Sequence, residues 1–559
     1  MSDSVTRNTR DLIRFLLRES NLLRSPVFVF VVLASASRTA MIFLINETAG
    51  RGGPDWLLFF ALIGSAAVML TATHFAKMSG VDLVQRLKLK MRNQISQCIL
   101  KADVSFFQSR AQGQVYHVAT GHVNDISGAA LRLVGIFQTL LLLIFCLGYM
   151  AWQLPASVLA TLIALVVGVG AFFATEGPAS RANRKSHDAT VAFYDSIHDL
   201  LRGYKELRLR GSRRKALSRT VEAQVQDAKD LTIASERHFS YGQIGSNGAL
   251  AALLIAVVVV LPLITDADSV LLLQLLTLVL FTAGPIEAMV GDLPALSRAG
   301  IAFRIFRNLE EDLENNAEHD ATADYDDNRP AFRSLELRGA TVHLTRDVGD
   351  DDKARDRFTL GPIDLTLYPG QSVFITGGNG MGKSTLLQLL TGLRHPDEGQ
   401  IFLDDMEVTR ANVAEYRGVF AAVFSEFYMF RHLYGMTEDE RARLQANIEE
   451  LGLGEGISLT GNRFTNLSLS TGQMRRLALS IALAEQRPII VLDEFAADQD
   501  PSRRTFFYDI LVPRLAQAGH CVVAVTHDEH CFHKCDRLIR MEDGRIISDE
   551  VHAKTAEAG

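Results

Sequence analysis

The sequence is poor in cysteine and has no excess of basic residues. Its 559 residues include only five cysteines, at positions 98, 146, 521, 531 and 535. Thiols so few and so scattered exclude the disulfide framework of a small secreted protein. Lysine and arginine together number 57, against 64 aspartates and glutamates, which gives a net charge of −7. Because no overall positive field is available to attract a polyanion, we expect no nucleic acid partner.

Long apolar runs are abundant. Hydrophobic residues make up 48% of the chain, and its length exceeds what a single core holds together. About 20 helical residues cross a hydrocarbon core of roughly 30 Å, so each long run is a candidate membrane span. Six such runs occur, at residues 26–45, 56–75, 131–152, 155–174, 247–265 and 269–290. The sequence therefore predicts an all-α membrane domain of six transmembrane helices in a lipid bilayer.

Charge in the connecting segments predicts the orientation. The segments between the second and third runs and between the fourth and fifth runs are rich in Lys and Arg, whereas Arg51 is the only basic residue in the short loops opposite them. Basic loops stay in the cytoplasm, so we expect both termini there. Helical patterning in the two basic segments predicts cytoplasmic helical stalks reaching about 40 Å below the membrane, at 1.5 Å per residue. Two independent soluble inserts are the alternative.

An acidic stretch follows the sixth run. Residues 309–328 are rich in Asp and Glu and contain no Lys or Arg, which is typical of a solvated linker. Beyond it, strand-like runs at 372–376, 489–492 and 522–525 alternate with helical stretches, so we expect an α/β domain with a mainly parallel sheet. The predicted organisation is a transmembrane domain at residues 1–308, a linker at 309–330 and a second domain at 331–559.

A glycine-rich loop follows the first of these strands and opens a helix. The string from Gly377 to Thr385 has the form G-x-x-x-x-G-K-[ST], whose backbone N–H groups close around phosphate oxygens beside a helix N-terminus. Lys383 can reach the β- and γ-phosphates of ATP, and the Ser384 hydroxyl can bind Mg²⁺. The residues predicted to hold nucleotide here are Gly377, Asn379, Gly380, Gly382, Lys383, Ser384 and Thr385.

Two carboxylates end the strand at 489–492. Ligands of open α/β sheets bind at the carboxyl ends of the strands, so Asp493 is predicted to hold Mg²⁺ and Glu494 to polarise the attacking water as general base. The alternative is a buried acid pair that only caps the strand. With the phosphate loop present, the combination favours a P-loop ATPase.

The string Leu469 to Gln473 lies about 20 residues before Asp493. Alone it could be a helix N-cap with a tight turn, but its spacing fits the L-S-x-G-Q signature of ABC transporter ATPases. The stretch 497–500 matches the D-loop of that family, and His527 after a predicted strand matches its switch histidine. Six spans, two stalks and this order of motifs together resemble an ABC exporter half-transporter.

The resemblance implies a composite site. In that family the signature of one subunit completes the ATP site on the phosphate loop of another, so a chain with one copy of each implies a homodimer. It also implies catalytic roles for Glu494 and for His527, which contacts the γ-phosphate and positions the water. The further residues implied to contact nucleotide are Ser470, Gly472, Gln473 and Asp500.

Two positions depart from the family pattern. The Q-loop glutamine is replaced by Ser425, which is too short to span the same gap, so Glu426 is expected to take its place near Mg²⁺. At the position of the aromatic residue that stacks on adenine in the family, this sequence has His343 and Leu344. Phe358 is the alternative residue for stacking on the base.

Three short sequence strings suggest the class of molecule that is transported. Residues 493–501, the Leu-Ser-Thr-Gly-Gln string and Phe-Ser-Glu-Phe resemble a bacterial subgroup that exports cyclic peptides, lipopeptide toxins and siderophore precursors. This implies an inner-membrane exporter of a peptide-type metabolite that works by alternating access. A lipid or lipid-linked precursor flippase and a membrane-anchored regulatory ATPase without cargo are the alternatives. Candidate cargo contacts, unless they hydrogen-bond between helices, are Arg38, Gln138, Gln243, Asn247 and Gln274.

Overall fold

The structure of the chain is a computed structural model. It describes residues 2–20, 25–50, 55–109, 112–264, 269–318, 332–347 and 355–552. The chain divides into two compact units. The first contains Met1–Ile99 and Ala111–Asp312, and the second contains Leu100–Arg110 and Leu313–Gly559. A short piece of the N-terminal half thus belongs to the C-terminal unit.

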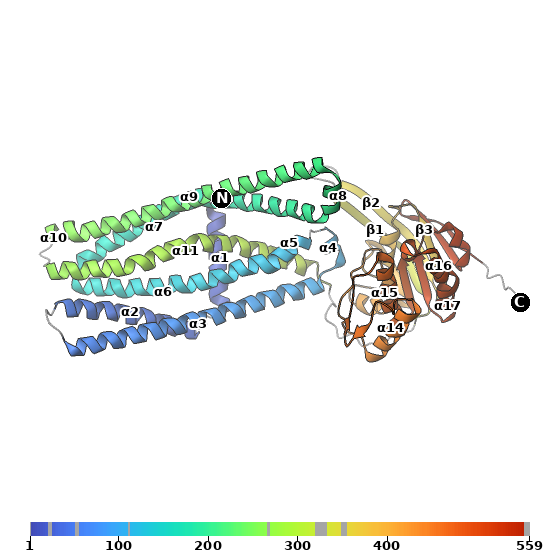
Figure 1. Cartoon of the computed structure of the whole chain (residues 1–559), viewed down its shortest axis with the longest axis horizontal. Helices are drawn as coiled ribbons and strands as arrows, with labels where there is room; N and C mark the ends of the chain where they lie inside the picture. The colour runs from blue at the N-terminus through green and yellow to red at the C-terminus, as the bar shows by residue number, and fades with distance from the viewer. Residues whose placement is uncertain are drawn as a thin grey trace. The chain divides into compact units, whose positions relative to one another are not determined.

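The first unit is built of helices (Figure 1). They are α1 (Ser2–Ser20), α2 (Pro26–Gly50), α3 (Trp56–Lys101), α5 (Gln112–His117), α6 (Val123–Gln153), α7 (Pro155–Arg202), α8 (Tyr204–Leu209), α9 (Gly211–Ile255), α10 (Leu261–Ile264) and α11 (Ser269–Asn315). π-Helical turns at Val118–His122 and Ala256–Val260 precede α6 and α10. The last residues of α3 and α11 reach into the second unit.

Apolar side chains of α2, α6, α9 and α11 form a core in this unit. It contains Ile42, Cys146, Leu253 and Leu278, all nearly or fully buried. Helices α7 and α9 run side by side (Figure 1). Their backbones come close at Gly245, where an added Cβ would lie 2.8 Å from the Cβ of Ala171. Small residues permit such close approach of helices in a membrane.

Five helical segments in the described part of the chain are long and apolar enough to cross a membrane. They are Pro26–Thr48, Trp56–Lys101, Val115–Gln153, Gly211–Ile264 and Ser269–Asn315. The remaining predicted span, 155–174, falls within α7, where a shorter apolar stretch is found at Ser157–Gly168. The membrane domain is therefore helical as expected, and the full count of six spans stays a prediction.

The predicted stalks are continuations of these helices. Helix α3 has 46 residues, α7 has 48 and α9 has 45. At 1.5 Å per residue each is about 70 Å long, roughly twice the thickness of a hydrocarbon core. The apolar helices on either side of each basic segment therefore continue into it, with short helices between them, α4 and α5 in the first segment and α8 in the second. We find no separate soluble insert among the described residues there.

The acidic stretch begins inside a helix. Helix α11 runs to Asn315, and Leu309, Glu310 and Leu313 are buried rather than solvated. Glu310 is held by hydrogen bonds from Gln94 and Arg307, which explains how an acidic residue can lie inside the packing. Residues 319–330 of the predicted linker lie outside the described residues.

The described strands of the second unit (Figure 1) form three sheets according to their hydrogen bonding. The six-stranded sheet has the order β12 (Arg545–Val551), β11 (Arg537–Glu542), β3 (Ser372–Gly377), β10 (Cys521–Val525), β9 (Ile489–Asp493), β6 (Phe420–Val423). The four-stranded sheet has the order β2 (Arg355–Leu367), β1 (Leu335–Asp347), β4 (Glu398–Leu403), β5 (Met406–Glu407). The small hairpin pairs β7 (Leu459–Thr460) with β8 (Arg463–Phe464).

Helices accompany these sheets. They are α4 (Val104–Ser109), α12 (Lys383–Leu390), α13 (Val413–Arg417), α14 (Glu438–Glu450), α15 (Thr471–Ala484), α16 (Pro501–Phe506) and α17 (Val512–Gln517). 3₁₀ turns lie at Phe495–Asp498 and Glu529–Lys534, and a π-helical turn lies at Phe507–Leu511.

The large sheet is parallel except for β12. Its central strands β9 and β10 are buried along their whole length, as apolar runs in a sheet covered on both faces require. The three strand-like runs predicted from the sequence correspond to β3, β9 and β10. The antiparallel four-stranded sheet was not predicted, because its strands carry no phosphate or acid motif and read only as short apolar runs.

Candidate functional site

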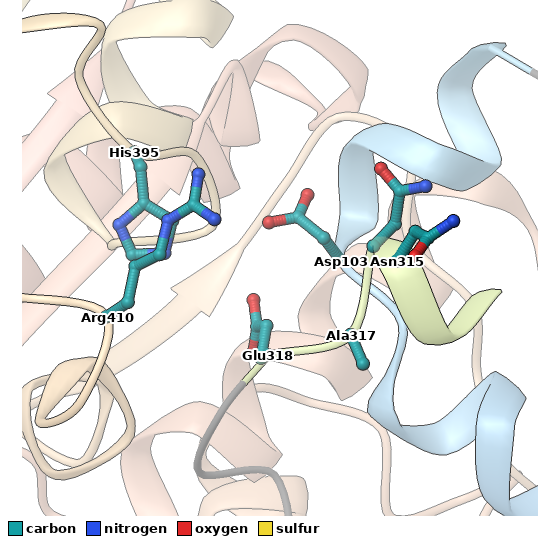
Figure 2. A pocket seen from close by; sticks show the side chains of 7 residues that line it. Asp103, Asn315, Ala317, Glu318, His395 and Arg410 are labelled. Carbon is teal, nitrogen blue, oxygen red and sulfur yellow. The ribbon is translucent and has the colours of Figure 1, made fainter. Parts of the chain in front are cut away.

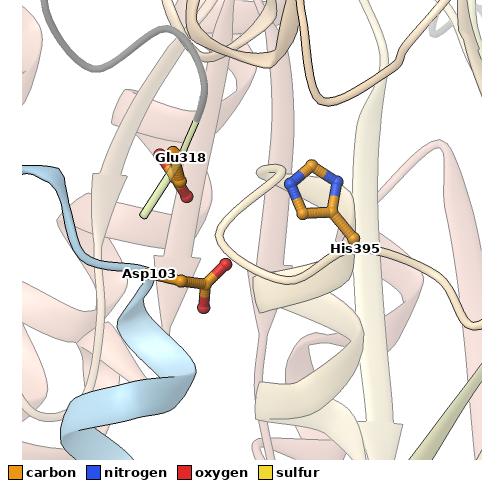
Figure 3. A group of neighbouring side chains, drawn as sticks. All are labelled: Asp103, Glu318 and His395. Atoms are coloured by element: carbon orange, nitrogen blue, oxygen red, sulfur yellow. The ribbon is translucent and has the colours of Figure 1, made fainter. Parts of the chain in front are cut away.

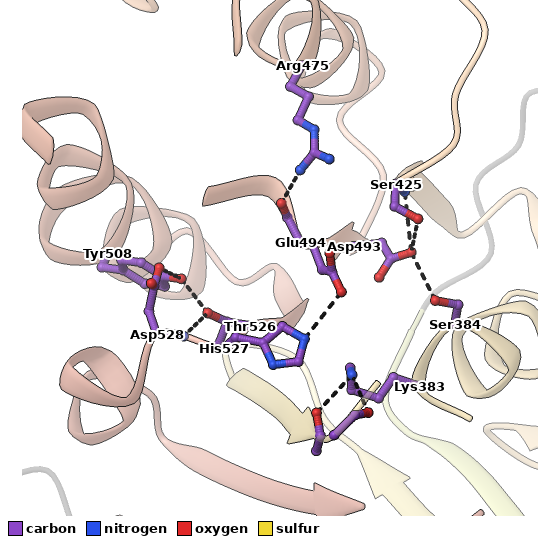
Figure 4. A network of polar contacts seen from close by, with 12 residues as sticks. Lys383, Ser384, Ser425, Arg475, Asp493, Glu494, Tyr508, Thr526, His527 and Asp528 are labelled. Atoms are coloured by element: carbon purple, nitrogen blue, oxygen red, sulfur yellow. Dashed lines mark hydrogen bonds and ion pairs between the residues drawn. The ribbon is translucent and has the colours of Figure 1, made fainter. Parts of the chain in front are cut away.

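Three neighbouring strands of the large sheet end at the same edge. Val525 of β10 pairs with Ile375 of β3 on one side and with Asp493 of β9 on the other. The glycine-rich loop, Asp493-Glu494 and Thr526-His527 therefore follow adjacent parallel strands. The sheet register brings together residues that are more than a hundred positions apart in the sequence (Figure 4).

The glycine-rich loop connects β3 to α12. Gly377 is the last residue of β3, Asn379 and Gly380 lie in the turn, and Lys383, Ser384 and Thr385 form the first turn of α12. Gly382 caps that helix with φ 90°, and an added Cβ would lie 2.9 Å from the ring of Phe358. A residue with a side chain is disfavoured there by both backbone conformation and space.

Lys383 lies inside this loop. Its Nζ donates hydrogen bonds of 2.9 Å to the carbonyl oxygens of Gly377 and Gly378. Burial lowers the pKa of Lys383, and the nearby carboxylates of Glu494 and Asp493 oppose that shift. The loop thus holds an ammonium group where the motif requires a phosphate ligand.

Asp493 links the loop to the segment after β6. Its Oδ2 accepts hydrogen bonds from Ser384 Oγ at 3.3 Å and from Ser425 Oγ at 2.9 Å. Its Oδ1 is buried and has no hydrogen-bond partner among the described residues. A buried carboxylate oxygen with a free lone pair, beside two hydroxyls, is a donor set that suits Mg²⁺. The residues present therefore fit the expected ion.

The Q-loop position differs from the sequence-based expectation. Ser425 contacts Asp493 through both its hydroxyl and its backbone N–H. Glu426 is exposed and makes no hydrogen bond or ion pair with any other described residue. The serine does not need to span the gap of a glutamine, because the backbone after β6 brings it within 2.9 Å of Asp493. The structure thus favours Ser425 over Glu426 at the expected metal site.

Glu494 and His527 face each other across the strand ends. Glu494 Oε1 lies 3.3 Å from His527 Nε2, and both side chains are partly exposed. Glu494 adopts the left-handed conformation with φ 51° and ψ 34°, which costs a non-glycine residue of the order of 1–2 kcal/mol. This backbone turn directs the carboxylate away from the sheet toward the histidine. A carboxylate and an imidazole at this spacing can share and orient a water molecule.

The segment around His527 is anchored by a polar cluster. The Tyr508 hydroxyl donates to Asp528 Oδ2 at 2.9 Å and also contacts the Thr526 hydroxyl at 2.5 Å. Burial raises the pKa of Tyr508 well above its usual value. Because a neutral phenol can donate while the carboxylate accepts, the residues on both sides of His527 are fixed.

Ser470 and Gln473 form a capping box at the start of α15. The Gln473 side chain accepts from the Ser470 backbone N–H at 2.9 Å, and Ser470 Oγ accepts from the Gln473 N–H at 3.3 Å. The N-cap interpretation of this string is therefore correct, and it coexists with the predicted contact to nucleotide. Gly472 stands in the first turn, where an added Cβ would lie 2.5 Å from the carbonyl oxygen of Asp498.

Asp500 caps the next helix, α16. Its Oδ1 accepts hydrogen bonds from Ser502 Oγ at 2.6 Å and from the Arg503 N–H at 2.9 Å. These hydrogen bonds lower the pKa of Asp500. The structure thus shows a local role for Asp500, and its predicted contact with nucleotide remains a prediction.

The candidate adenine contacts lie on paired strands. Leu344 of β1 pairs with Phe358 of β2, and His343 pairs with Thr359. His343 is exposed and its Nδ1 lies 3.2 Å from Thr359 Oγ1. Phe358 is partly buried against the core and against Gly382. Of the three, Phe358 is the aromatic side chain that adjoins the phosphate loop.

Comparisons with known proteins agree with this geometry. The family pattern for the ABC transporter transmembrane region matches residues 27–284, and that for the ABC transporter matches residues 360–497. The "ATP-binding protein SyrD" of Pseudomonas syringae pv. syringae is 30% identical over 529 residues, covering 93% of this chain and 92% of that protein. The chain belongs to the ABC transporter family.

Further relatives and a solved structure extend the match. An "ATP-dependent lipid A-core flippase" of Burkholderia orbicola (strain AU 1054) is 25% identical over 92% of this chain and 87% of that protein. The "Probable syringafactin export ATP-binding/permease protein SyfD" of Pseudomonas syringae pv. syringae (strain B728a) is 33% identical over 39% of this chain and 34% of that protein.

The fold of this ABC transporter matches that of a bacterial Atm1-family ABC exporter with ATP bound. The TM-score is 0.77 at 18% identity, covering 96% of this chain and 95% of that one. The transporter is a half-transporter with one membrane region and one ATP-binding domain, which hydrolyses ATP to drive export. The expected enzyme class is thereby confirmed.

Sequence reasoning missed two contacts of this transporter's ATPase site. Arg475 donates a hydrogen bond to the carbonyl oxygen of Glu494, and Tyr508 holds the residues beside His527. Neither lies within a phosphate or acid motif. The available signals were weak: a charged residue in the buried part of a helix, and a tyrosine in an otherwise apolar segment.

A second polar pocket lies within the C-terminal unit of the transporter (Figure 2). Asp103, Glu318 and His395 face one another there, with ligand atoms within 4.8 Å (Figure 3). Glu318 already accepts hydrogen bonds of 2.6 and 2.7 Å from both terminal nitrogens of Arg417. Burial lowers the pKa of His395, and nearby Arg410 adds to that effect. A metal ion would compete with a guanidinium for the same carboxylate, so we interpret this pocket as a charge network.

Proposed function

We propose that this transporter exports a peptide-type secondary metabolite, such as a cyclic peptide, lipopeptide or siderophore precursor, across the bacterial inner membrane by alternating access. The similarity to a protein named for syringafactin export supports this cargo class, as do the strings at residues 493–501 and 469–473. Basic residues in the long connecting segments support a cytoplasmic location for both termini.

The ATPase cycle uses the residues at the edge of the large sheet. Ser384 and Asp493 would hold Mg²⁺, which supplies charge stabilisation for phosphoryl transfer. Glu494 accepts the proton of the attacking water and His527 orients that water. Ser470, Gly472, Gln473 and Asp500 of one copy complete the site of a second copy, so the working unit is a homodimer with composite ATP sites.

An apolar cavity in the first unit is the observation that carries the expectation of an amphipathic cargo. It lies between α6, α7, α9 and α11 and is lined mostly by Leu, Ile, Val and Ala side chains. Two of its hydroxyls are already used within their own helices, since Thr161 donates to the Ser157 carbonyl and Thr282 to the Val279 carbonyl. The cavity therefore favours the apolar part of an amphipathic molecule.

Three of the five predicted polar cargo contacts separate into two groups. Gln274 donates to the Asn46 carbonyl at 3.2 Å and Gln243 donates to Glu287 at 3.3 Å, so both take part in hydrogen bonds between helices. Arg38 stands in the middle of the span Pro26–Thr48 and makes no ion pair or hydrogen bond with any other described residue. A charge within a membrane span favours a functional role, and Arg38, which is half-buried, is our candidate contact for an anionic group of the cargo.

Reconstituted vesicles test the cargo class. We expect amphipathic peptides to stimulate ATP hydrolysis and lipids with varied head groups to leave it unchanged. Filling the cavity with Ala164→Phe should reduce the stimulation by peptide. The matched control Val166→Phe, on the exposed side of the same helix, should retain it. The proposal would be refuted if lipids with varied head groups stimulated ATP hydrolysis while peptides left the rate of hydrolysis unchanged.

A lipid or lipid-linked precursor flippase is the second candidate function. It is supported by the similarity to a lipid A-core flippase over most of both chains, and the apolar cavity would also admit an acyl chain.

A regulatory ATPase without cargo is the third candidate function. A turnover rate that no peptide or lipid changes, with no cargo protected from external reagents, would favour it.

A further inference from the structure

Arg475 connects helix α15 to the turn that follows strand β9, which runs from Glu494 to Asp498. It lies in the second turn of α15 and is 9% exposed. Its Nη1 donates a hydrogen bond to the carbonyl oxygen of Glu494, as Figure 4 shows. Its Nε lies 3.0 Å from Oδ2 of Asp498. The Nε–H does not point at that oxygen, so this second contact is an ion pair rather than a hydrogen bond.

The hydrogen bond from Arg475 supports an unusual backbone conformation at Glu494. Its left-handed conformation is disfavoured for a residue with a side chain and persists only where surrounding groups fix it. The Glu494 N–H donates to the Val525 carbonyl at 3.1 Å, and the Glu494 carbonyl accepts from the Ala497 N–H at 3.3 Å. Arg475 supplies the charged donor to the same carbonyl, so it fixes the peptide plane from which the Glu494 carboxylate projects.

The first turn of α15 touches the same segment. An added Cβ at Gly472 would lie 2.5 Å from the Asp498 carbonyl oxygen, and Gln499 Nε2 donates to the Gly472 carbonyl at 3.2 Å. The signature turn and the turn after Glu494 are thus in direct backbone contact. Arg475 adds a second connection one turn further along the helix.

We propose that Arg475 is a positioning residue for ATP hydrolysis, which transmits the position of the signature helix α15 to the carboxylate of Glu494. A guanidinium suits this role because its planar fork stays charged and reaches acceptors on two residues of the same turn at once. In a composite site the signature turn engages the nucleotide on the partner. Arg475 then couples that engagement to the hydrolytic carboxylate of its own chain.

Steady-state kinetics of the full-length transporter tests this role. Arg475→Met should lower kcat about 10- to 100-fold while KM for ATP changes less than about threefold, since the residue acts on the base rather than on ATP binding. Arg475→Lys keeps one donor and should recover about a tenth or more of the wild-type kcat. Combining Arg475→Met with Asp498→Asn should lower kcat no further than Arg475→Met alone, because both act through one connection.

Arg476→Met is the matched control. Arg476 lies on the same helix and donates to the Leu451 carbonyl at 2.8 Å, so its loss removes a similar anchor away from Glu494. We expect a comparable fall in Tm with kcat within about twofold of wild type. A wild-type kcat in Arg475→Met would overturn the proposal. A parallel loss of Tm and kcat in both variants would also overturn it, since that outcome is explained by helix stability alone.

Discussion

At the scale of single residues, we propose that two neighbouring carboxylates separate the binding of ATP from its hydrolysis. Asp493 faces the phosphate loop through Ser384, whereas Glu494 turns toward His527. The left-handed backbone of Glu494 separates the two carboxylates, so we propose different tasks for them. Substitutions at the two positions should therefore have different kinetic signatures.

Glu494→Gln should bind ATP and hardly hydrolyse it. The amide keeps the shape of the side chain but cannot take a proton from water, so we expect a loss of about 10²–10⁴-fold in kcat. Equilibrium binding of labelled ATP and a hydrolysis assay measure the two effects, and the ATP-bound protein should accumulate as a closed dimer. Near-normal turnover would refute the role of general base. Lys383→Ala should instead weaken ATP binding itself.

Ser425→Ala should raise the Mg²⁺ concentration needed for half-maximal ATPase activity. The hydroxyl donates to Asp493 Oδ2, and its loss frees the carboxylate to rotate away from the ion, for which we expect a shift of about three- to tenfold. Glu426→Ala is the control, because its exposed side chain does not contact Asp493. If the glutamate variant shows the larger Mg²⁺ shift, the original prediction for Glu426 is correct and that for Ser425 is wrong.

At the scale of elements, the buried core around the large sheet encloses two cysteine thiols. Cys521 begins β10 and is fully buried, and Cys535 lies just before β11 and is 3% exposed. Burial raises the pKa of the Cys521 thiol to about 12 and that of Cys535 to about 11. Both thiols are therefore kept neutral in the folded domain.

The stability of the ATPase domain should consequently fall above about pH 9. A thiol whose pKa is raised on folding stabilises the fold below its unfolded pKa, near 9, and this contribution is lost as pH rises toward the folded pKa. Each thiol then contributes a loss of about 1 kcal/mol per pH unit. Denaturant midpoints at pH 8, 9 and 10 measure it. Cys521→Val should show a smaller decline, and an equal decline in wild type and variant would exclude the thiol as its cause.

At the scale of the whole molecule, one chain carries one phosphate loop and one signature string. A composite site needs each from a different copy, so defects on the two sides should complement each other. The matching family regions for the membrane and ATP-binding parts occur once each, which agrees with assembly from two copies.

Mixing Lys383→Ala with Ser470→Arg should restore activity that neither variant has alone. A heterodimer of the two contains one site with both sides intact, so random mixing should give up to about a quarter of wild-type activity. ATPase assays on co-expressed, doubly tagged protein measure it. Mixing Lys383→Ala with Asp493→Asn is the control and should give no recovery, because both defects lie on the same side. A fully active single copy would contradict the composite site.

Local signals in the sequence determined the membrane half and the nucleotide motifs. Apolar runs long enough to span a bilayer form helices almost regardless of the elements around them. In lipid, the backbone N–H and C=O groups must form their hydrogen bonds within the segment itself. The phosphate-loop motif occupies eight consecutive residues that lead from a strand into a helix, and both elements are found where expected. Contiguous patterns of this kind are readable without tertiary information.

Contacts between distant segments were decided only by the tertiary structure. Ser425 and Asp493 are 68 residues apart, and Arg475 and Glu494 lie on a helix and a strand end whose approach is set by the close fit of Gly472 against Asp498. The choice of Ser425 over Glu426 depends on which side chain the backbone after β6 turns toward the sheet edge. Which residues share a site is fixed by strand register and helix packing, and these are properties of the folded chain rather than of any short stretch of it.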